Sequence, residues 1–204
     1  GFLEAAKISE EMGIQLIFGL RVTACDKIKQ DKSELLKTNH KIIVFAKDAA
    51  GCKLLNKIYS KAFLKGGGQI TMDALSDLWN EDCLKLAIPF YDSFIFKNTM
   101  SLSSCTPVFN FTRPTFFLEE NCLPFDALIK KRVIEFCKTK EFDTEKTKTI
   151  YYKNKKDFAA FQTYKCICNR GGWAGKAVSL EKPNLDHCGS SEFSLESWKE
   201  NNES

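Results

Sequence analysis

Residues 40–63 read HKIIVFAKDAAGCKLLNKIYSKAF and combine two hydrophobic patterns within one short stretch. Residues 41–46 form an apolar run rich in β-branched side chains, which is typical of a buried strand. Asp48 follows the run and is a suitable N-cap for a helix. Beyond it, apolar residues recur at helical spacing, and these are Leu54, Leu55, Ile58, Tyr59, Ala62 and Phe63. The stretch therefore predicts a strand followed directly by an amphipathic helix.

Alternating strands and helices are also predicted on both sides of this stretch. Upstream, we expect a helix over 2–12 that ends at Gly13, followed by a strand-like run over 14–24. Downstream, the patterns predict helices over 72–80, 124–139 and 157–168, and strands over 84–88, 107–111, 115–118 and 147–152. This order predicts an α/β fold with mostly parallel strands and outer helices. In such folds the active site lies at the carboxyl ends of the strands.

Composition excludes several classes of protein without naming a function. The chain has 204 residues, 44% of them hydrophobic and 27% charged, which is ordinary for a globular domain. Its net charge of +4 is too small to indicate a nucleic-acid-binding surface by itself. No apolar run approaches the length of a membrane-spanning helix, and the first residues do not resemble a signal peptide. We therefore expect a cytoplasmic protein that does not enter the membrane.

The cysteines predict a reducing, intracellular compartment. There are nine, an odd number, and they are scattered through apolar patterns rather than arranged as a secreted disulfide framework. One group could supply four zinc ligands, namely Cys166, Cys168, His187 and Cys188. Its C-x-C spacing is unlike the usual C-x₂-C, so the alternative is buried thiols followed by a loop. Both interpretations stay open at this point.

Several local strings resemble one protein family. Residues 1–19, from GFLE to IFG, resemble the G-[LV]-x-E to A-G-I-K-P-I-[IV]-G segment of the PHP (polymerase and histidinol phosphatase) domain at the N-terminus of bacterial replicative DNA polymerase III alpha subunits. Residues 40–63 match the family segment that begins H-L-x-L-L-A-K. Shorter matches follow in the same order at 84–89, at Phe117-Leu118-Glu119 and at 190–195. The resemblance covers most of the chain and implies a partial or distorted PHP-type (β/α) barrel.

The resemblance also implies where the family's metal ligands would fall. His40 is the one ligand position that keeps its residue type. The other positions carry different side chains, at Arg21, Phe90, Thr149 and Tyr151. The family's first ligands would precede Gly1, so we expect 1–172 to be a PHP-like domain lacking its first strands. Residues 173–204 are polar and are expected to form a loop-rich C-terminal extension.

These departures favour a protein without the family's phosphoesterase chemistry, because one imidazole cannot hold a catalytic metal cluster. The resemblance then implies a structural or docking module in DNA replication, with a polymerase core and a proofreading subunit as partners and with DNA contacted indirectly. No cofactor is expected. The first alternative is a metal-dependent phosphoesterase or 3'-5' proofreading nuclease using Zn or Mn, and the second is an unrelated α/β protein-interaction domain. A sheet without its first strands would also expose an edge through which two chains could form a homodimer.

Overall fold

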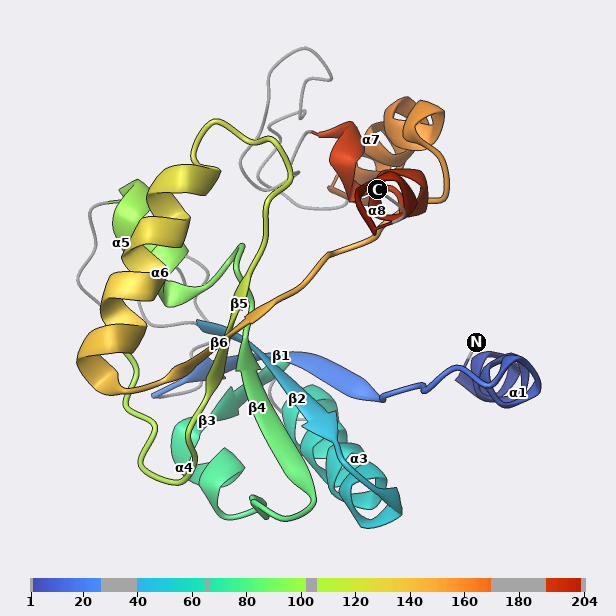
Figure 1. The fold of residues 1–204 in the computed structure, drawn as a ribbon. Helices are drawn as coiled ribbons and strands as arrows, with labels where there is room; N and C mark the ends of the chain where they lie inside the picture. The colour runs from blue at the N-terminus through green and yellow to red at the C-terminus, as the bar shows by residue number, and fades with distance from the viewer. Residues whose placement is uncertain (1, 27–39, 65–66, 102–105, 170–189, 203–204) are drawn as a thin grey trace. The chain divides into compact units, whose positions relative to one another are not determined.

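The structure is a computed structural model that describes residues 2–26, 40–64, 67–101, 106–169 and 190–202. The chain divides into two compact units (Figure 1). Unit 1 comprises residues 1–116 and 139–143, and unit 2 comprises residues 117–138 and 144–204. Among the described residues, no helix has the length and apolar character needed to cross a membrane.

A mixed β-sheet forms the centre of unit 1. The strands are β1 (Gly19–Cys25), β2 (His40–Ala46), β3 (Gln69–Thr71), β4 (Leu84–Ile88), β5 (Thr115–Leu118) and β6 (Asp143–Lys146). They are arranged in the order β3-β1-β2-β4-β5-β6, and β5 and β6 continue into unit 2. Strand β2 pairs antiparallel with both β1 and β4, whereas β3 is parallel to β1 and β5 is parallel to β4. Four strands therefore run in one direction and β2 runs in the other.

One face of this sheet forms a hydrophobic core with helix α3 (Ala49–Leu64). Alternate residues of β1, β2 and β4 point to that face, and Val22, Ile42, Val44 and Leu86 are at most 1% exposed. The first turn of α3 is capped as predicted, because the Asp48 carboxylate accepts a hydrogen bond from the Gly51 backbone N–H at 2.7 Å. A Cβ at Gly51 would lie 2.3 Å from the Cys83 carbonyl oxygen, so glycine permits the close approach of α3.

Among the described residues, three further helices belong to unit 1. Helix α1 (Phe2–Met12) ends at Gly13, which has a φ of +66° and is connected to β1 by an extended segment (Figure 1). Helix α4 (Met72–Ser76) follows β3 and is capped by the Thr71 hydroxyl. Helix α5 (Phe94–Ser101) follows the turn after β4.

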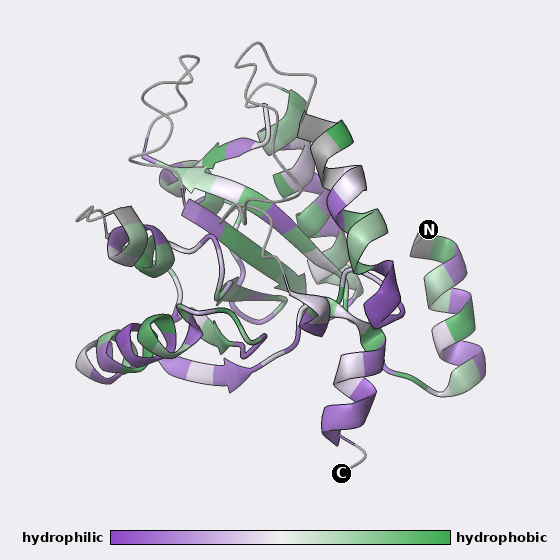
Figure 2. Cartoon of the chain, turned by 90° about the horizontal axis from the view of Figure 1, so that it is seen from above, coloured by the Kyte–Doolittle hydropathy of each residue, from purple (hydrophilic) through white to green (hydrophobic). Residues whose placement is uncertain are grey.

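Unit 2 contains most of helix α6 (Asp126–Lys140) and the C-terminal part of the chain. Its other helices are the 3₁₀ turns η1 (Lys155–Asp157) and η3 (Ser191–Phe193), with α7 (Phe158–Asn169) and α8 (Leu195–Asn202). Phe193 is fully buried and Tyr151 stacks on Phe161 with ring centroids 5.0 Å apart. Helix α8, which leads to the C-terminal label, is mostly hydrophilic in colour (Figure 2).

The predicted α/β class is confirmed, with outer helices on a sheet whose strands mostly run in one direction. The structure also confirms helices in the regions 2–12, 49–63, 126–139 and 158–168 and strands in the regions 41–46, 84–88 and 115–118. A barrel stays a prediction. The homodimer formed through an exposed sheet edge also stays a prediction. The two outermost strands in the order, β3 and β6, have only three and four residues.

Two predicted strands are wrong. Residues 107–111 are irregular, and Pro107 offers no backbone N–H to a neighbouring strand. Residues 147–151 are extended but are not a strand, because after Thr147, whose N–H donates to the Leu118 carbonyl of β5, two further N–H groups bond elsewhere. The Thr149 N–H donates to the Glu119 carboxylate and the Tyr151 N–H donates to the Phe193 carbonyl. Tyr152 forms only an isolated bridge.

Residues 173–204 were predicted to form a loop-rich extension, but part of this segment is helical. Within 173–204 the structure describes residues 190–202, and α8 with the preceding η3 turn makes most of them helical. The Ser190 hydroxyl accepts from the Glu192 N–H and starts that turn. Helix α5 and strand β3 were not predicted either.

Candidate functional site

Because β2 runs opposite to its neighbours, the ends of several strands meet at one edge of the unit 1 sheet. Strands β1, β3 and β4 end there, and β2 begins there with His40. The turn after β4, which contains Phe90 and Asp92, follows at the same edge. This is the carboxyl edge at which ligands bind in α/β sheets, and it contains three of the residues that the sequence resemblance marks.

Arg21 on β1 forms an ion pair at this edge. Its Nη2 lies 2.8 Å from Oδ2 of Asp92, and both side chains are less than half exposed. Asp92 has a φ of +63°, a left-handed conformation that costs energy for a residue with a Cβ. The turn after β4 therefore holds a strained aspartate against the guanidinium.

Lys41 lies on the same face of the sheet as Arg21. The register pairs Thr23 with Lys41 and Arg21 with Ile43, so the two cationic residues are diagonal neighbours across β1 and β2. The half-buried Lys41 ammonium donates a hydrogen bond of 2.7 Å to the Thr23 hydroxyl. Burial lowers the pKa of Lys41, and the nearby Arg21 charge lowers it further. Arg21 and Lys41 therefore lie close together on this face beside one carboxylate, Asp92, an arrangement that suits an anion and opposes a divalent metal.

His40 belongs to the opposite face, because it is paired with Ala24 and follows the alternation of Ile42 and Val44. It is only 4% exposed and its ring meets Phe94 edge to face at 5.9 Å between centroids. Burial lowers the pKa of His40 to about 4, and the Lys97 charge contributes to this shift. The imidazole is therefore neutral at pH 7. Since His40 and Arg21 point to opposite faces, they do not form one ligand set.

Phe90 is the second residue after the end of β4 and is fully buried. Its ring packs edge to face against Tyr91 with centroids 4.9 Å apart. An aromatic ring without a donor atom occupies this position, so Phe90 contributes packing and no ligand.

The other two positions marked by the resemblance belong to unit 2. The Thr149 hydroxyl donates to Oε1 of Glu119 at 2.7 Å, and its N–H donates to Oε2 at 3.1 Å. The amide of Asn121 also donates to Oε2, at 3.0 Å. Burial raises the pKa of Glu119, while these hydrogen bonds act in the opposite direction. Two hydrogen bonds thus join Thr149 to the buried Glu119 carboxylate. Tyr151 is stacked on Phe161.

The alternative zinc group is only partly described. Cys166 and Cys168 lie on helix α7, whereas His187 and Cys188 lie outside the described residues. Over the described ranges, the His, Cys, Asp and Glu side chains form no group of three or more that could hold a metal ion. The zinc interpretation stays a prediction.

Sequence reasoning missed the residues that surround Arg21. Lys41, Thr23 and Asp92 come together only through strand register and a turn that follows a different strand. One signal was present in the sequence. Arg21 and Thr23 alternate with Val22 and Ala24, which is the pattern of a strand with one polar side and one apolar side. The contact between Glu119 and Thr149 has a weaker signal, a pair of acidic residues directly after an apolar strand.

Comparisons with known proteins identify no relative of this chain. No family model matches the chain, and no curated protein matches it in sequence. The function must therefore be argued from the residues and their geometry.

Proposed function

We propose that the chain is a non-catalytic PHP-like module of a DNA polymerase III alpha-type protein, serving as a structural or docking domain in DNA replication. The observation that carries the proposal is the Arg21–Asp92 ion pair at 2.8 Å. Arg21 takes the position where the resemblance places an acidic metal ligand, and it engages the nearby carboxylate of Asp92.

The electrostatics around Arg21 support the loss of metal chemistry. Lys41 lies diagonally across the sheet on the same face, so a Zn or Mn ion would meet two positive charges. His40 is a neutral imidazole that could bind metal, but it lies on the other face among apolar residues. The residues present therefore do not fit the metal cluster that the family implies.

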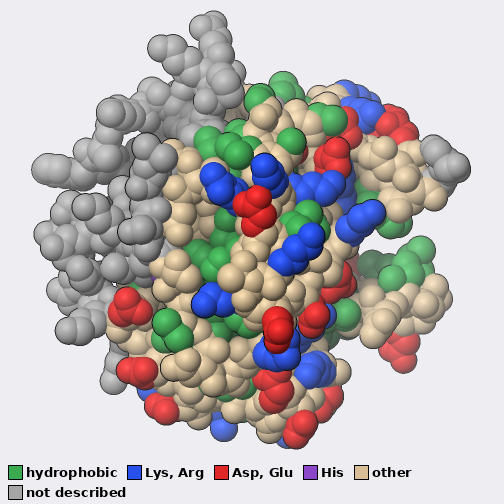
Figure 3. All heavy atoms as spheres, turned by 60° about the vertical axis from the view of Figure 1, so that its left-hand side comes forward, with side chains coloured by type: hydrophobic (Ala, Val, Ile, Leu, Met, Phe, Trp, Pro, Cys, Tyr) green, Lys and Arg blue, Asp and Glu red, His purple; other side chains and the backbone are tan. Residues whose placement is uncertain are grey.

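A docking role is supported by the surface in Figure 3. Acidic and basic side chains are interspersed on this face, without a stripe of one sign. Such a surface suits protein partners better than a direct grip on DNA, whose phosphates favour clustered cations. The proposed partners are the polymerase core and a proofreading subunit, and the proposed fold of the module is a distorted PHP-type barrel.

Metal binding and hydrolysis test the proposal. The purified chain, dialysed against Mn or Zn, is expected to retain no stoichiometric metal and not to hydrolyse p-nitrophenyl phosphate. Arg21→Glu removes the central positive charge, and Arg132→Glu on the exposed surface of α6 is the matched charge control. Stoichiometric metal with hydrolysis by the unaltered chain would instead establish the phosphoesterase or nuclease alternative.

Co-purification tests the replication role separately. The chain is expected to form a complex with a polymerase III-type proofreading subunit in size-exclusion chromatography. Failure to bind either this subunit or the polymerase core would leave the unrelated α/β protein-interaction domain as the better explanation.

A further inference from the structure

Unit 2 contains a pocket of about 610 Å³ that the proposed function does not use. Its wall combines the segment after β5, one residue of α6, the segment that continues β6, and helix α8. The residues that line it are Leu118, Glu119, Glu120, Cys122, Lys130, Lys146, Thr147, Lys148, Glu192, Trp198, Asn201 and Asn202. The volume falls within the range of roughly 300–1,000 Å³ that is usual for small-molecule sites.

Helix α8 presents an aromatic ring and two amides to this pocket. Trp198, Asn201 and Asn202 are spaced i, i+3 and i+4, so they share one face of the helix. Trp198 is 42% exposed, and its ring stacks on no other aromatic ring among the described residues. The amide nitrogens of Asn201 and Asn202 donate to Ser197 and to the Trp198 carbonyl. Their oxygens remain able to accept hydrogen bonds from a ligand.

Two lysines face the pocket, Lys146 from the last position of β6 and Lys148 from the extended segment after it. Lys146 and Lys148 are two residues apart, which places their side chains on the same side of an extended chain. Neither forms an ion pair with any residue that the structure describes. Lys148 donates a hydrogen bond to the Ser197 hydroxyl at 3.5 Å, and its charge also acts on the Glu119 carboxylate.

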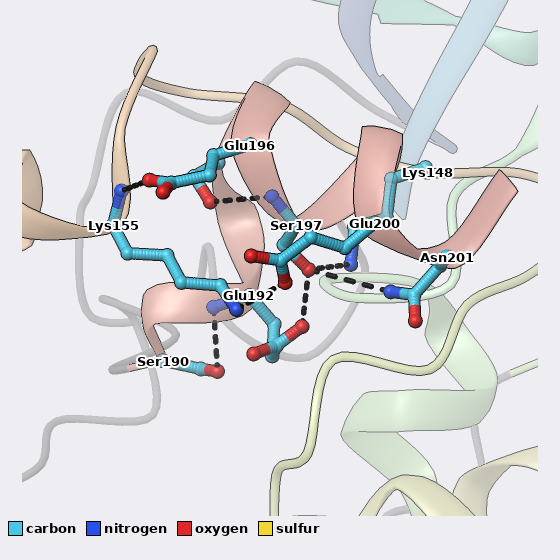
Figure 4. Close-up of polar contacts among 9 residues, drawn as sticks. Lys148, Lys155, Ser190, Glu192, Glu196, Ser197, Glu200 and Asn201 are labelled. Atoms are coloured by element: carbon cyan, nitrogen blue, oxygen red, sulfur yellow. Dashed lines mark hydrogen bonds and ion pairs between the residues drawn. The ribbon is translucent and has the colours of Figure 1, made fainter. Parts of the chain in front are cut away.

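The carboxylates of the pocket already have partners within the protein. Both oxygens of Glu119 accept hydrogen bonds from Thr149 or Asn121, and Glu120 is paired with Lys130 at 3.1 Å. Glu192 accepts from the buried Ser197 hydroxyl, which lies at the centre of the network in Figure 4. Apart from the Glu120–Lys130 ion pair, the lining holds two glutamates with neutral hydrogen-bond partners and two lysines, so it is balanced in charge, and Lys146 and Lys148 are the cationic groups that a phosphate could contact.

We propose that this pocket binds a nucleotide, with the base stacked on Trp198 and the phosphate held by Lys146 and Lys148. Stacking on an aromatic side chain with lysines along the backbone is a general way of holding nucleotide units. The Asn201 and Asn202 oxygens accept from the amino groups of the base. The nucleotide is either a free mononucleotide or one unit of a single strand, and both share this chemistry.

The test measures binding to the full chain by calorimetry and by Trp fluorescence. The probes are dAMP, deoxyadenosine, inorganic phosphate and a short single-stranded oligonucleotide. We expect dAMP to bind more tightly than deoxyadenosine or phosphate, because only dAMP engages both halves of the pocket. Oligonucleotide binding stronger than dAMP binding identifies a strand as the source, and the reverse order identifies a free nucleotide.

Three variants locate the binding. Trp198→Ala should weaken dAMP binding at least ~5-fold, the low end of one lost stacking interaction. Lys146→Ala should reduce dAMP affinity without changing that for deoxyadenosine. Lys199→Ala, on α8 but outside the lining, is the matched control and should bind as the unaltered chain does. If Trp198→Ala does not fold, Trp198→Phe replaces it.

Two results would overturn the proposal. One is no dAMP binding at millimolar concentration. The other is binding that is equal for phosphate alone or unchanged in both the Trp198 and the Lys146 variants. Neither result bears on metal binding at Arg21, so the proposed function and this inference fail independently.

Discussion

Acidification should destabilise the protein through His40. The ring is 4% exposed, and its pKa falls to about 4 because burial disfavours the imidazolium, with Lys97 adding repulsion and Asp26 opposing it. In the unfolded chain the pKa returns to 6.5. Between these two values the unfolded state binds a proton that the folded state does not. The contribution of His40 is therefore complete above pH 6.5 and is lost as the pH falls towards 4.

The magnitude follows from the difference between the two pKa values. A shift from 6.5 to about 4 corresponds to roughly 3 kcal/mol when the loss is complete. Between pH 7 and pH 5 the same linkage predicts a loss of about 2 kcal/mol from His40 alone. That is a large part of the total stability of an ordinary domain.

Urea denaturation at several pH values between 7 and 5 measures this effect, with His40→Gln as the comparison. The variant loses the contact with Phe94 and is less stable at pH 7, but its stability should fall less steeply on acidification. Other titrating groups are common to both proteins, so the difference between the two slopes isolates His40. Parallel curves for the two proteins, or an NMR titration of the His40 ring near pH 6.5, would refute the reasoning.

Three substitutions test the packing that positions the sites. Gly51→Ala should destabilise the protein by about 1–3 kcal/mol in urea denaturation, since its Cβ would lie 2.3 Å from the Cys83 carbonyl oxygen. An unchanged urea midpoint would show that α3 moves to accommodate the added methyl group without a loss of stability. Glu119→Ala leaves the half-buried N–H of Thr149 without its acceptor and should cost about 1–3 kcal/mol, whereas Glu119→Gln should cost less; equal losses would contradict this. Phe193→Ala should cost about 3–5 kcal/mol because the ring is fully buried, and amide exchange in unit 2 should accelerate. A loss below 1 kcal/mol would mean that the cavity collapses.

The parts of the fold that could be predicted from the sequence are those specified by neighbouring residues. Strand β2 and helix α3 are encoded by a β-branched run, a capping aspartate and an apolar stripe, all within 40–63. Helix α6 has the same kind of local specification. Its buried residues Ile129, Val133 and Cys137 recur every four positions.

The failed predictions depend on partners far away in the sequence. Residues 147–151 have the composition of a strand, but the N–H groups of Thr149 and Tyr151 donate to the Glu119 side chain and to the Phe193 carbonyl. Periodicity reports which side chains are buried and not which group accepts a given N–H. Strand β3 has three residues, too short for a period-two pattern to be seen.

The candidate site shows the same division between local and distant information. His40 precedes an apolar run, so the sequence places it at the amino end of a strand. In a wholly parallel sheet that end would be opposite the edge where ligands bind. Because β2 runs antiparallel to β1 and β4, His40 instead lies at their carboxyl edge. The pairing of Thr23 with Lys41 then sets Lys41 beside Arg21. The charge of this edge is thus a consequence of strand direction, a property that no single segment specifies.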